Sequence, residues 1–125
     1  MSMEQLQEFE KQHQALVAKL DSIGFIGQGN IQWRWKVCGK PNCACRRDPA
    51  LRHGPYPYWT TKQENKTVNK RLHPDEAALL EQWIENRRTL EAVISQMKAL
   101  AQQAFDTALK VYQQQTPDHH HLSGN

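Results

Sequence analysis

The sequence predicts an α+β protein in which a zinc-stapled, three-stranded antiparallel β-sheet head is inserted between two long helices. Three observations support this fold class: apolar residues at helical spacing near both ends of the chain, a strand-like alternation between them, and three cysteines followed by a histidine in the middle. The chain has 125 residues, of which 38% are hydrophobic, so it can bury only a small core. Small domains of this kind usually need disulfides, a bound metal or a partner chain for stability.

The N-terminal segment, residues 1–23, is predicted to form a helix over about residues 3–22. Its seam positions recur in steps of three and four, as on one face of a helix: Leu6, Phe9, His13, Leu16, Leu20 and Ile23. The stretch GFIGQGN, residues 24–30, contains three glycines and an asparagine and is expected to end this helix. We interpret His13 as a packed or partner-facing histidine rather than a metal ligand.

Residues 74–115 are predicted to form one long helix that pairs with the first in an antiparallel coiled-coil stalk. Pro74 suits a first helical turn, and Asp75 and Glu76 complement the helix dipole there. The seam of this helix again follows steps of three and four: Leu80, Trp83, Arg87, Leu90, Ile94, Met97, Ala101, Ala104, Ala108 and Val111. We interpret Arg87 as a snorkelling side chain or a cross-helix partner for an acidic residue.

The long helix would extend well beyond the first one, because no glycine or proline interrupts it before Pro117. Its unmatched half has an alanine-rich seam, which permits close approach by another helix. We therefore predict a homodimer through the C-terminal helix, with a frayed helix as the alternative. Residues 116–125 are expected to form a disordered tail.

Residues 30–73 are predicted to form the β head. Positions 31–37 alternate, so that Ile31, Trp33, Trp35 and Val37 share one face. Residues 58–62 and 66–72 are expected to pair as a hairpin around QENK. In an even register, Trp59, Val68 and Leu72 would join the tryptophan side, and Trp33, Trp35 and Trp59 would form the core of the head. The opposite face would carry Gln32, Arg34, Lys36, Tyr58, Thr60, Lys62, Thr67, Asn69 and Arg71.

All three cysteines lie within the pattern Cys-x4-Cys-x-Cys-x7-His, formed by Cys38, Cys43, Cys45 and His53. Three cysteines and one histidine are an accepted ligand set for a structural, tetrahedral Zn²⁺. Four protein ligands leave no open coordination position, so we expect the protein not to be an enzyme. Inert reduced thiols, or a redox or iron–sulfur role, are the alternatives.

The charges are divided unevenly along the chain. Residues 31–72 contain ten lysines and arginines against two carboxylates, which gives +8, whereas the rest of the chain sums to −5. This asymmetry predicts a polyanionic partner for the head, and nucleic acid, above all DNA, is our first candidate. The candidate nucleic-acid-binding residues are Arg34, Lys36, Lys40, Arg46, Arg47, Arg52, Lys62, Asn69, Lys70 and Arg71. Tyr56 and Tyr58 would suit stacking on single strands; an acidic protein partner, or plain solubility, would also explain the charge.

Several stretches resemble a family of small uncharacterised bacterial proteins with a CGKPxCxC…HGPY head. These stretches are CGKPNCACRRDPALRHGPYPYW, LHPDE and WIENRRTLE, and the resemblance covers about residues 34–95. It implies a zinc-binding head with Cys38, Cys43, Cys45 and His53 at the matching positions, followed by a hairpin and a long helix. Members occur with mobile-element genes, which implies a role in transposition or DNA recombination. The family tends to place a glycine in the hairpin turn, where this chain has ENKT.

The leading hypothesis is a zinc-dependent, non-enzymatic DNA-binding accessory or regulatory protein of a mobile element, working beside a larger recombinase. The alternative is a coiled-coil protein–protein adaptor with a structural zinc head, and a third possibility is a small enzyme or thiol redox sensor. No apolar run approaches the roughly 18 residues needed to span a membrane, and the N-terminus has no signal-peptide pattern. We therefore expect a cytoplasmic protein with reduced cysteines and no membrane partner.

Overall fold

The structure is a computed structural model that describes residues 3–115; the predicted tail, residues 116–125, lies outside the described residues. The elements follow one another as helix α1 (Met3–Asp21), strand β1 (Asn30–Lys36), the 3-10 helices η1 (Ala44–Arg46) and η2 (Pro49–Leu51), strands β2 (His53–Gln63) and β3 (Lys66–Arg71), and helix α2 (Pro74–Gln115). The three strands form one antiparallel sheet in the order β1-β2-β3. This confirms the α+β class, the antiparallel sheet and the two helices.

The chain divides into two compact units, and α2 contributes to both. One, here called the helical unit, consists of the described parts of Met1–Ile23 and Thr89–Asn125. The other, here called the sheet unit, is Gly24–Arg88 and contains the sheet, both 3-10 helices and the beginning of α2. The first turns of α2 thus belong with the sheet.

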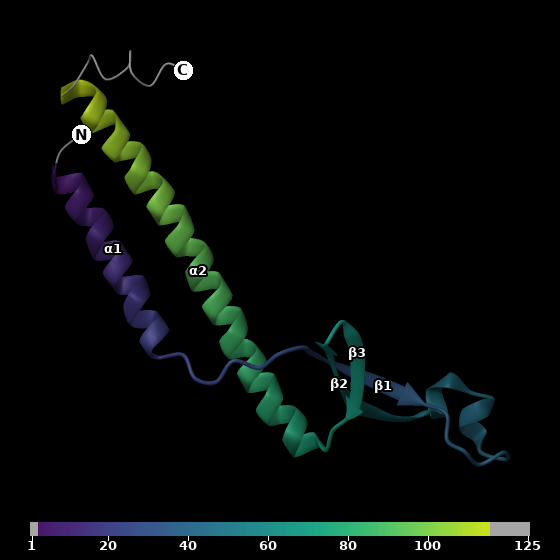
Figure 1. Cartoon of the computed structure of the whole chain (residues 1–125). Helices are drawn as coiled ribbons and strands as arrows, with labels where there is room; N and C mark the ends of the chain where they lie inside the picture. Colours follow the sequence, from purple (N-terminus) through teal and green to yellow (C-terminus); the bar gives the residue numbers. More distant parts are fainter. Residues whose placement is uncertain (1–2, 116–125) are drawn as a thin grey trace. The chain divides into compact units, whose positions relative to one another are not determined.

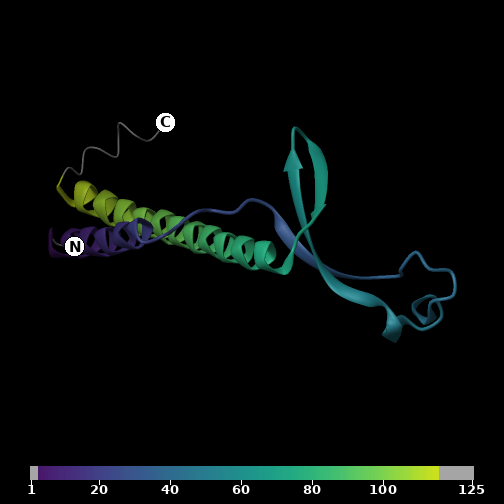
Figure 2. The same ribbon diagram turned by 90° about the horizontal axis from the view of Figure 1, so that it is seen from below.

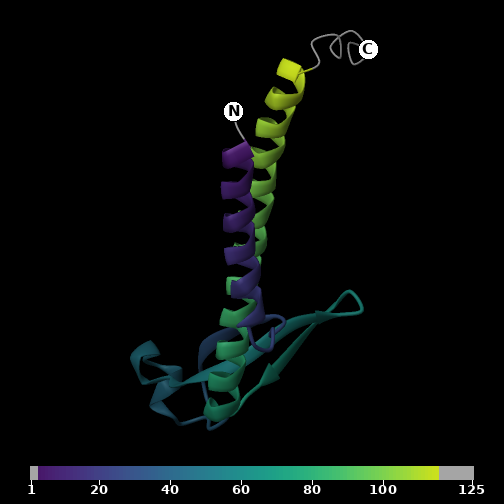
Figure 3. The same ribbon diagram turned by 90° about the vertical axis from the view of Figure 1, so that its left-hand side faces the viewer.

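In the helical unit, α1 lies side by side with the later part of α2, and the two run in opposite directions (Figures 1 and 3). The buried residues of α2 here are Val93, Leu100 and Thr107, spaced seven apart. Of the predicted seam, Ile94 is 39% exposed. Ala101 lines a cavity shared with Leu6 and Phe9 of α1. The predicted seam and the stripe that contains the buried residues share Met97, Ala104 and Val111. Spacing alone therefore does not decide which of the two stripes faces α1. The coiled-coil stalk stays a prediction.

In the sheet unit, the two faces of the sheet divide as the alternation predicted from Ile31 to Arg34, after which the register of β1 and β2 shifts. Ile31 pairs with Trp59 and Arg34 with Tyr56, while Thr60 pairs with Asn69. The hairpin turns at Glu64 and Asn65, whose φ values of 50° and 65° are those of a type I′ turn. We call one side of the sheet the tyrosine face, which carries Gln32, Arg34, Lys36, Tyr56, Tyr58, Thr60, Lys62, Thr67, Asn69 and Arg71. The other is the tryptophan face, which carries Ile31, Trp33, Trp59, Thr61, Val68 and Lys70.

The predicted tryptophan core was wrong for Trp33 and Trp35, whereas Trp59 is half-buried. Trp33 and Trp35 are 48% and 56% exposed, whereas Tyr58, on the opposite face, is only 7% exposed. The reason is that the long side chains of Arg34 and Lys36 cover the Tyr58 ring. The indole of Trp33 is instead near the surface and donates its Nε1–H to Glu81 Oε1 of α2 at 3.0 Å.

The segment 24–29, expected only to end a helix, runs along the beginning of α2. Gly27 N–H donates to the Trp83 carbonyl at 2.9 Å, and the Arg87 guanidinium donates to the carbonyls of Gly27 and Gly29 at 2.8 and 2.9 Å. A Cβ on Gly27 would lie 2.9 Å from Trp83 Cβ, so only glycine permits this close approach. Arg87 therefore holds backbone carbonyls, a role that its place on the predicted seam did not suggest.

Across residues 3–115, neither helix combines the length and the apolar character that crossing a membrane requires.

Candidate metal centre and adjoining basic face

Residues 37–53, here called the cysteine loop, run from the end of β1 to the first residue of β2 (Figure 2). Gly39, Pro41 and Asn42 favour a turn here, and Cys43 N–H closes it by donating to the Lys40 carbonyl at 3.3 Å. The guanidinium of Arg46 then donates to the carbonyls of Lys40 and Cys38, at 3.1 and 3.3 Å. Arg46 thus ties the loop to itself through backbone oxygens.

The loop brings all four predicted metal ligands together. One ligand atom from each of Cys38, Cys43, Cys45 and His53 lies within 4.8 Å of the others. The sulfurs of Cys45 and Cys38 are 3.5 Å apart, and Cys43 Sγ is 3.4 Å from His53 Nε2. A tetrahedral ion with bonds of 2.3 Å has ligands about 3.8 Å apart. The four side chains are free thiols and an imidazole at metal-ligand spacing, and they could bind a metal ion.

His53 reaches the cysteines because β1 and β2 pair irregularly at this point. The register shifts between Arg34 and Lys36, and His53 pairs with Lys36 beyond the irregularity. The following Gly54 has φ +127°, and a Cβ there would lie 2.8 Å from the Arg34 carbonyl oxygen. Only glycine therefore fits at the residue that directs His53 into the cluster.

The thiols differ in their electrostatic environment. The pKa of Cys43 is lowered, first because the backbone N–H of Cys45 donates to its sulfur and then because the thiols of Cys45 and Cys38 do so. For Cys45, the Cys38 N–H acts to lower the pKa, but burial and the neighbouring Cys43 and Cys38 outweigh it, so the pKa is raised. Cys45 is also the most buried residue of the loop, at 2% exposed. A bound cation would offset this penalty, because a coordinating thiol is deprotonated by the metal itself.

On the tyrosine face, cations rest on aromatic rings. Arg34 Cζ and Lys36 Nζ lie 4.8 and 4.6 Å from the centroid of the Tyr58 ring, and Arg71 Cζ lies 3.8 Å from that of Tyr56. Such contacts each stabilise by about 0.5–2 kcal/mol, depending on exposure. The sequences of β1, β2 and β3 contain no aspartate or glutamate. The cations of this face are therefore held in place by aromatic rings, and no carboxylate in the three strands neutralises their charge.

Polar side chains connect the middle of this face. Asn69 Oδ1 accepts hydrogen bonds from Thr60 Oγ1 at 2.9 Å and from the Arg34 guanidinium at 3.3 Å. Arg34 Nε also donates to Gln32 Oε1 at 3.1 Å. Asn69 thus positions Arg34, and among the described residues its amide NH₂ has no hydrogen-bond partner, so it can bind another group.

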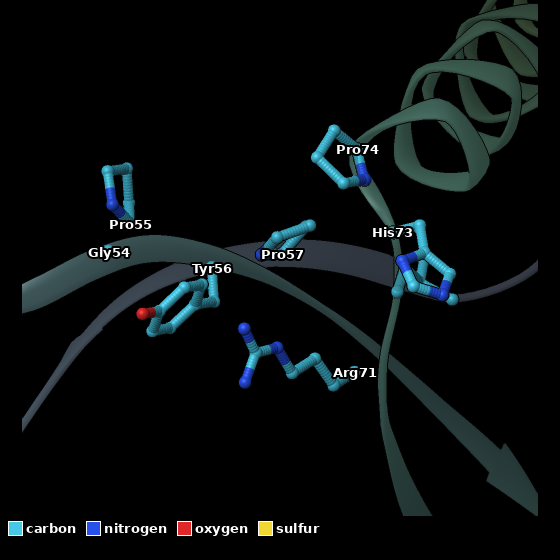
Figure 4. Close-up of a pocket in the computed structure, with 8 residues that line it drawn as sticks. Gly54, Pro55, Tyr56, Pro57, Arg71, His73 and Pro74 are labelled. Carbon is cyan, nitrogen blue, oxygen red and sulfur yellow. The ribbon is translucent and has the colours of Figure 1, made fainter. Parts of the chain in front are cut away.

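Two cavities flank the stacked pair of Tyr56 and Arg71. The larger, about 560 Å³, lies between β2 and the residues that precede α2, with Pro55, Pro57 and His73 in its walls. Figure 4 shows the Arg71 guanidinium directed toward the Tyr56 ring in this cavity. The smaller, about 420 Å³, lies toward the metal ligands and includes Tyr56 and Arg71 as well.

A protein-family model described as Domain of unknown function (DUF6788) matches residues 6–82. The chain belongs to this DUF6788 family. The match extends from α1 through the cysteine loop and the sheet into the beginning of α2. Membership agrees with the predicted resemblance to an uncharacterised family, while the bacterial origin and the CGKPxCxC…HGPY motif stay predictions. Neither a curated protein nor a solved structure matches the chain.

Within the part matched by the DUF6788 model, the predicted basic residues do not all gather on one surface. Arg34, Lys36, Lys62, Asn69 and Arg71 share the tyrosine face, whereas Lys70 lies on the tryptophan face. The others, Lys40, Arg46, Arg47 and Arg52, belong to the cysteine loop. Tyr58 was considered as a stacking platform, but its ring is covered by Arg34 and Lys36, so it supports cations instead. Tyr58 pairs with Gln32, and the next two residues of β1 on the same face, Arg34 and Lys36, are both basic, which was the signal for this role.

Proposed function

We propose that this protein is a non-enzymatic, zinc-dependent nucleic-acid-binding protein, with DNA as the expected ligand. The observation that carries the proposal is the tyrosine face, on which Arg34, Lys36 and Arg71 are ordered by stacking on two tyrosines. Cations held in this way lose little conformational freedom when they meet phosphates, and each phosphate contact releases counterions from the nucleic acid. The Thr60–Asn69 pair lies among them and offers polar groups that reach base edges or phosphates.

Zinc is the proposed metal because of the donor set. Three soft thiolates and one imidazole match zinc in structural sites, and the coordination shell would be closed by protein ligands alone. Its role is therefore to fold the cysteine loop, which carries Lys40, Arg47 and Arg52 beside the sheet. With no open coordination position, we expect no hydrolytic or redox activity from this centre.

Fluorescence anisotropy tests the proposal with labelled duplex DNA, single-stranded DNA and RNA, each at two salt concentrations. Zinc-loaded and chelator-treated proteins are compared side by side. We expect zinc-dependent binding that weakens steeply with salt, because phosphate contacts dominate the affinity. The absence of binding by folded, zinc-loaded protein to all three ligands would overturn the proposal.

We also expect the protein to act as a cytoplasmic accessory or regulatory factor of a mobile element, in transposition or DNA recombination, beside a larger recombinase. A dimer through α2 would give two basic faces on one ligand and so raise the effective concentration of each. Two large aromatic side chains near the end of α2, Phe105 and Tyr112, are 58% and 61% exposed, and a second copy of α2 would cover them. Light scattering tests the dimer. We expect the unchanged protein to be a dimer and Phe105→Glu to be a monomer. An unchanged protein that is itself monomeric would exclude the dimer.

The alternative function is a protein–protein adaptor with a structural zinc centre. The half-exposed indoles of Trp33 and Trp35 favour it, since large aromatic side chains are enriched at protein interfaces. The adaptor predicts one specific partner that is lost with Trp35→Ser, together with negligible affinity for nucleic acid at moderate salt. Steeply salt-dependent nucleic-acid binding that persists in Trp35→Ser favours the first function.

A further inference from the structure

The smaller cavity of about 420 Å³ lies where the tyrosine face meets the metal centre. Lys36 and Tyr56 contribute to it from the sheet, together with Arg71 from β3. Lys40, Cys43 and His53 contribute from the cysteine loop. Its volume falls within the range of small-ligand sites and exceeds what a single ion needs.

The charges around this cavity all favour an anion. Its three charged wall residues are the cations Lys36, Lys40 and Arg71, and none of its wall residues is an aspartate or glutamate. Among residues 3–115, none of these three side chains forms an ion pair. A zinc ion with three thiolates and a neutral histidine would contribute a net charge of −1. The cavity therefore stays positive when the metal is bound.

Two of the three cations are already oriented. Arg71 is stacked 3.8 Å above Tyr56, and Lys36 lies 4.6 Å from the centre of the buried Tyr58 ring. Arginine in a fixed orientation can donate two parallel hydrogen bonds to one phosphate, whereas lysine acts as a point charge. We infer that this cavity is a phosphate subsite, in which Arg71 holds the phosphate oxygens and Lys36 and Lys40 supply further charge.

The third cation connects the subsite to the metal. Lys40 lies in the turn that Cys43 N–H closes, and the Arg46 guanidinium holds the Lys40 carbonyl. Binding of a metal by Cys38, Cys43 and Cys45 fixes both sides of this turn. Metal loading thus fixes Lys40 at the cavity that Arg71 also lines, whereas Lys36 and Arg71 are held on the sheet without the metal.

The identity of the phosphate rests on the proposed function. We assign the group that occupies the subsite to a backbone phosphodiester of the bound nucleic acid. The same chemistry would admit inorganic phosphate or a mononucleotide. The chemical group and its source are therefore tested by separate measurements on the full-length, zinc-loaded protein.

The first measurement is anisotropy with labelled oligonucleotides for Arg71→Ala, Lys36→Ala and the control Lys66→Ala. Lys66 is on the same strand as Arg71 but five residues away and on the opposite face. We expect Arg71→Ala to weaken binding roughly 5- to 10-fold and to lower the slope of log affinity against log salt by about one. Lys66→Ala should change affinity less than about twofold. Zinc titration of each variant confirms that the metal centre is intact.

The second measurement is an NMR titration with inorganic phosphate and with a mononucleotide, in which the Arg71 Nε–H and the Lys40 amide are observed. Shifts at both signals in the unchanged protein, together with loss of the Lys40 amide shift in Arg71→Ala, support the subsite even if no oligonucleotide binds, and in that case only the proposed function fails. Oligonucleotide binding that Arg71→Ala and Lys36→Ala reduce no more than Lys66→Ala does would overturn the subsite and leave the proposed function standing. Absence of both responses would overturn both.

Discussion

The two ends of the sheet unit are held together by different means. At the helix end, segment 24–29 is hydrogen-bonded to α2 and to the Trp59 indole of β2. The buried residues here include Gly27, Thr61, Leu72, Ala77 and Ile84. At the cysteine end, residues 37–53 contain a single buried residue, Cys45. Even Leu51 in this stretch is 53% exposed. One end has a small core with backbone hydrogen bonds, and the other has a cluster of ligands in place of a core.

The difference indicates what each end needs in order to be ordered. Burial of apolar area and hydrogen bonds such as Gly27 N–H to the Trp83 carbonyl stabilise the helix end from within the chain. At the cysteine end, the cross-links are hydrogen bonds from the exposed Arg46 guanidinium to two backbone carbonyls and sulfur contacts of 3.4–3.5 Å, and the sulfur contacts contribute little by themselves. Structural zinc binding is worth about 10–16 kcal/mol in small metal-folded peptides. A bound metal is therefore the expected source of order for the end that carries Lys40.

The largest expected effect is loss of the metal centre in Cys45→Ser. Removal of a ligand should lower zinc affinity more than about 100-fold, since even outer-shell changes cost 10–100-fold. A competition titration against a coloured chelator measures this loss. In ¹H–¹⁵N spectra, the amides of residues 37–53 should collapse to unfolded positions, while those of 57–61 and 77–87 stay dispersed.

Ala44→Ser is the matched control for that variant, because it places a serine in the neighbouring, exposed position of η1. It should bind zinc like the unchanged protein. Collapse of the helix-end amides in zinc-free Cys45→Ser would contradict the comparison, since the two ends would then unfold together.

The next largest effect is expected at the other end, in Arg87→Ala. The variant leaves the carbonyls of Gly27 and Gly29 without their charged donor, which should cost about 2–3 kcal/mol in the free energy of unfolding. Urea unfolding measures it. The adjacent Arg88→Ala should cost less than about 0.5 kcal/mol, because Arg88 is exposed and its ion pair is with Glu85, one turn away on the same helix. If Arg87→Ala lowers the free energy of unfolding no more than Arg88→Ala does, the stability of the helix end does not depend on the hydrogen bonds from Arg87 to the carbonyls of Gly27 and Gly29.

The strand periodicity and turn chemistry predicted much of the sheet. The alternation of residues 31–34, the hairpin around QENK and the even register agree with the observed pairing, whereas the register of β1 and β2 shifts between Arg34 and Lys36. Periodicity does not report which face is covered, however. Trp33 and Trp35 were assigned to the core by residue type, yet two cations of the opposite face bury Tyr58 instead. Burial of Tyr58 by these cations depends on how neighbouring strands pair. The alternation within a single strand carries no information about that pairing.

The four candidate ligands were predictable because they lie close together in the sequence. Clustered cysteines that are not in disulfides most often bind a metal. The order of the basic residues was not predictable, because it depends on long-range pairing: Lys70 and Arg71 are neighbours in sequence and lie on opposite faces. The role of Arg87 depends on carbonyl groups sixty residues earlier in the chain, as hydrogen bonds to Gly27 show. A helical seam pattern cannot reveal such a contact.

The junction between the two ends is tested by Gly54→Ala. The new Cβ would meet the Arg34 carbonyl at 2.8 Å, at a backbone φ of +127° that alanine rarely adopts, so the variant should lose about 2 kcal/mol of stability. Zinc affinity should fall as well, because His53 is the preceding residue. Gly39→Ala is the control, since a Cβ there meets nothing within 4 Å. If Gly54→Ala unfolds more easily but binds zinc normally, the position of His53 does not depend on the junction.

The smallest effect is expected from the double substitution Glu64→Asn with Asn65→Gly in the hairpin turn. Both positions have positive φ, and Asn-Gly is the preferred pair for a type I′ turn, so the variant should gain about 0.5–1 kcal/mol of stability. Thermal unfolding with and without zinc measures the gain. Because the turn is at the tip of β2 and β3, away from the cysteine loop in the chain, zinc affinity should not change. A zinc affinity that rises with hairpin stability would instead show that the sheet transmits order to the cysteine end, and the two ends would not be independent.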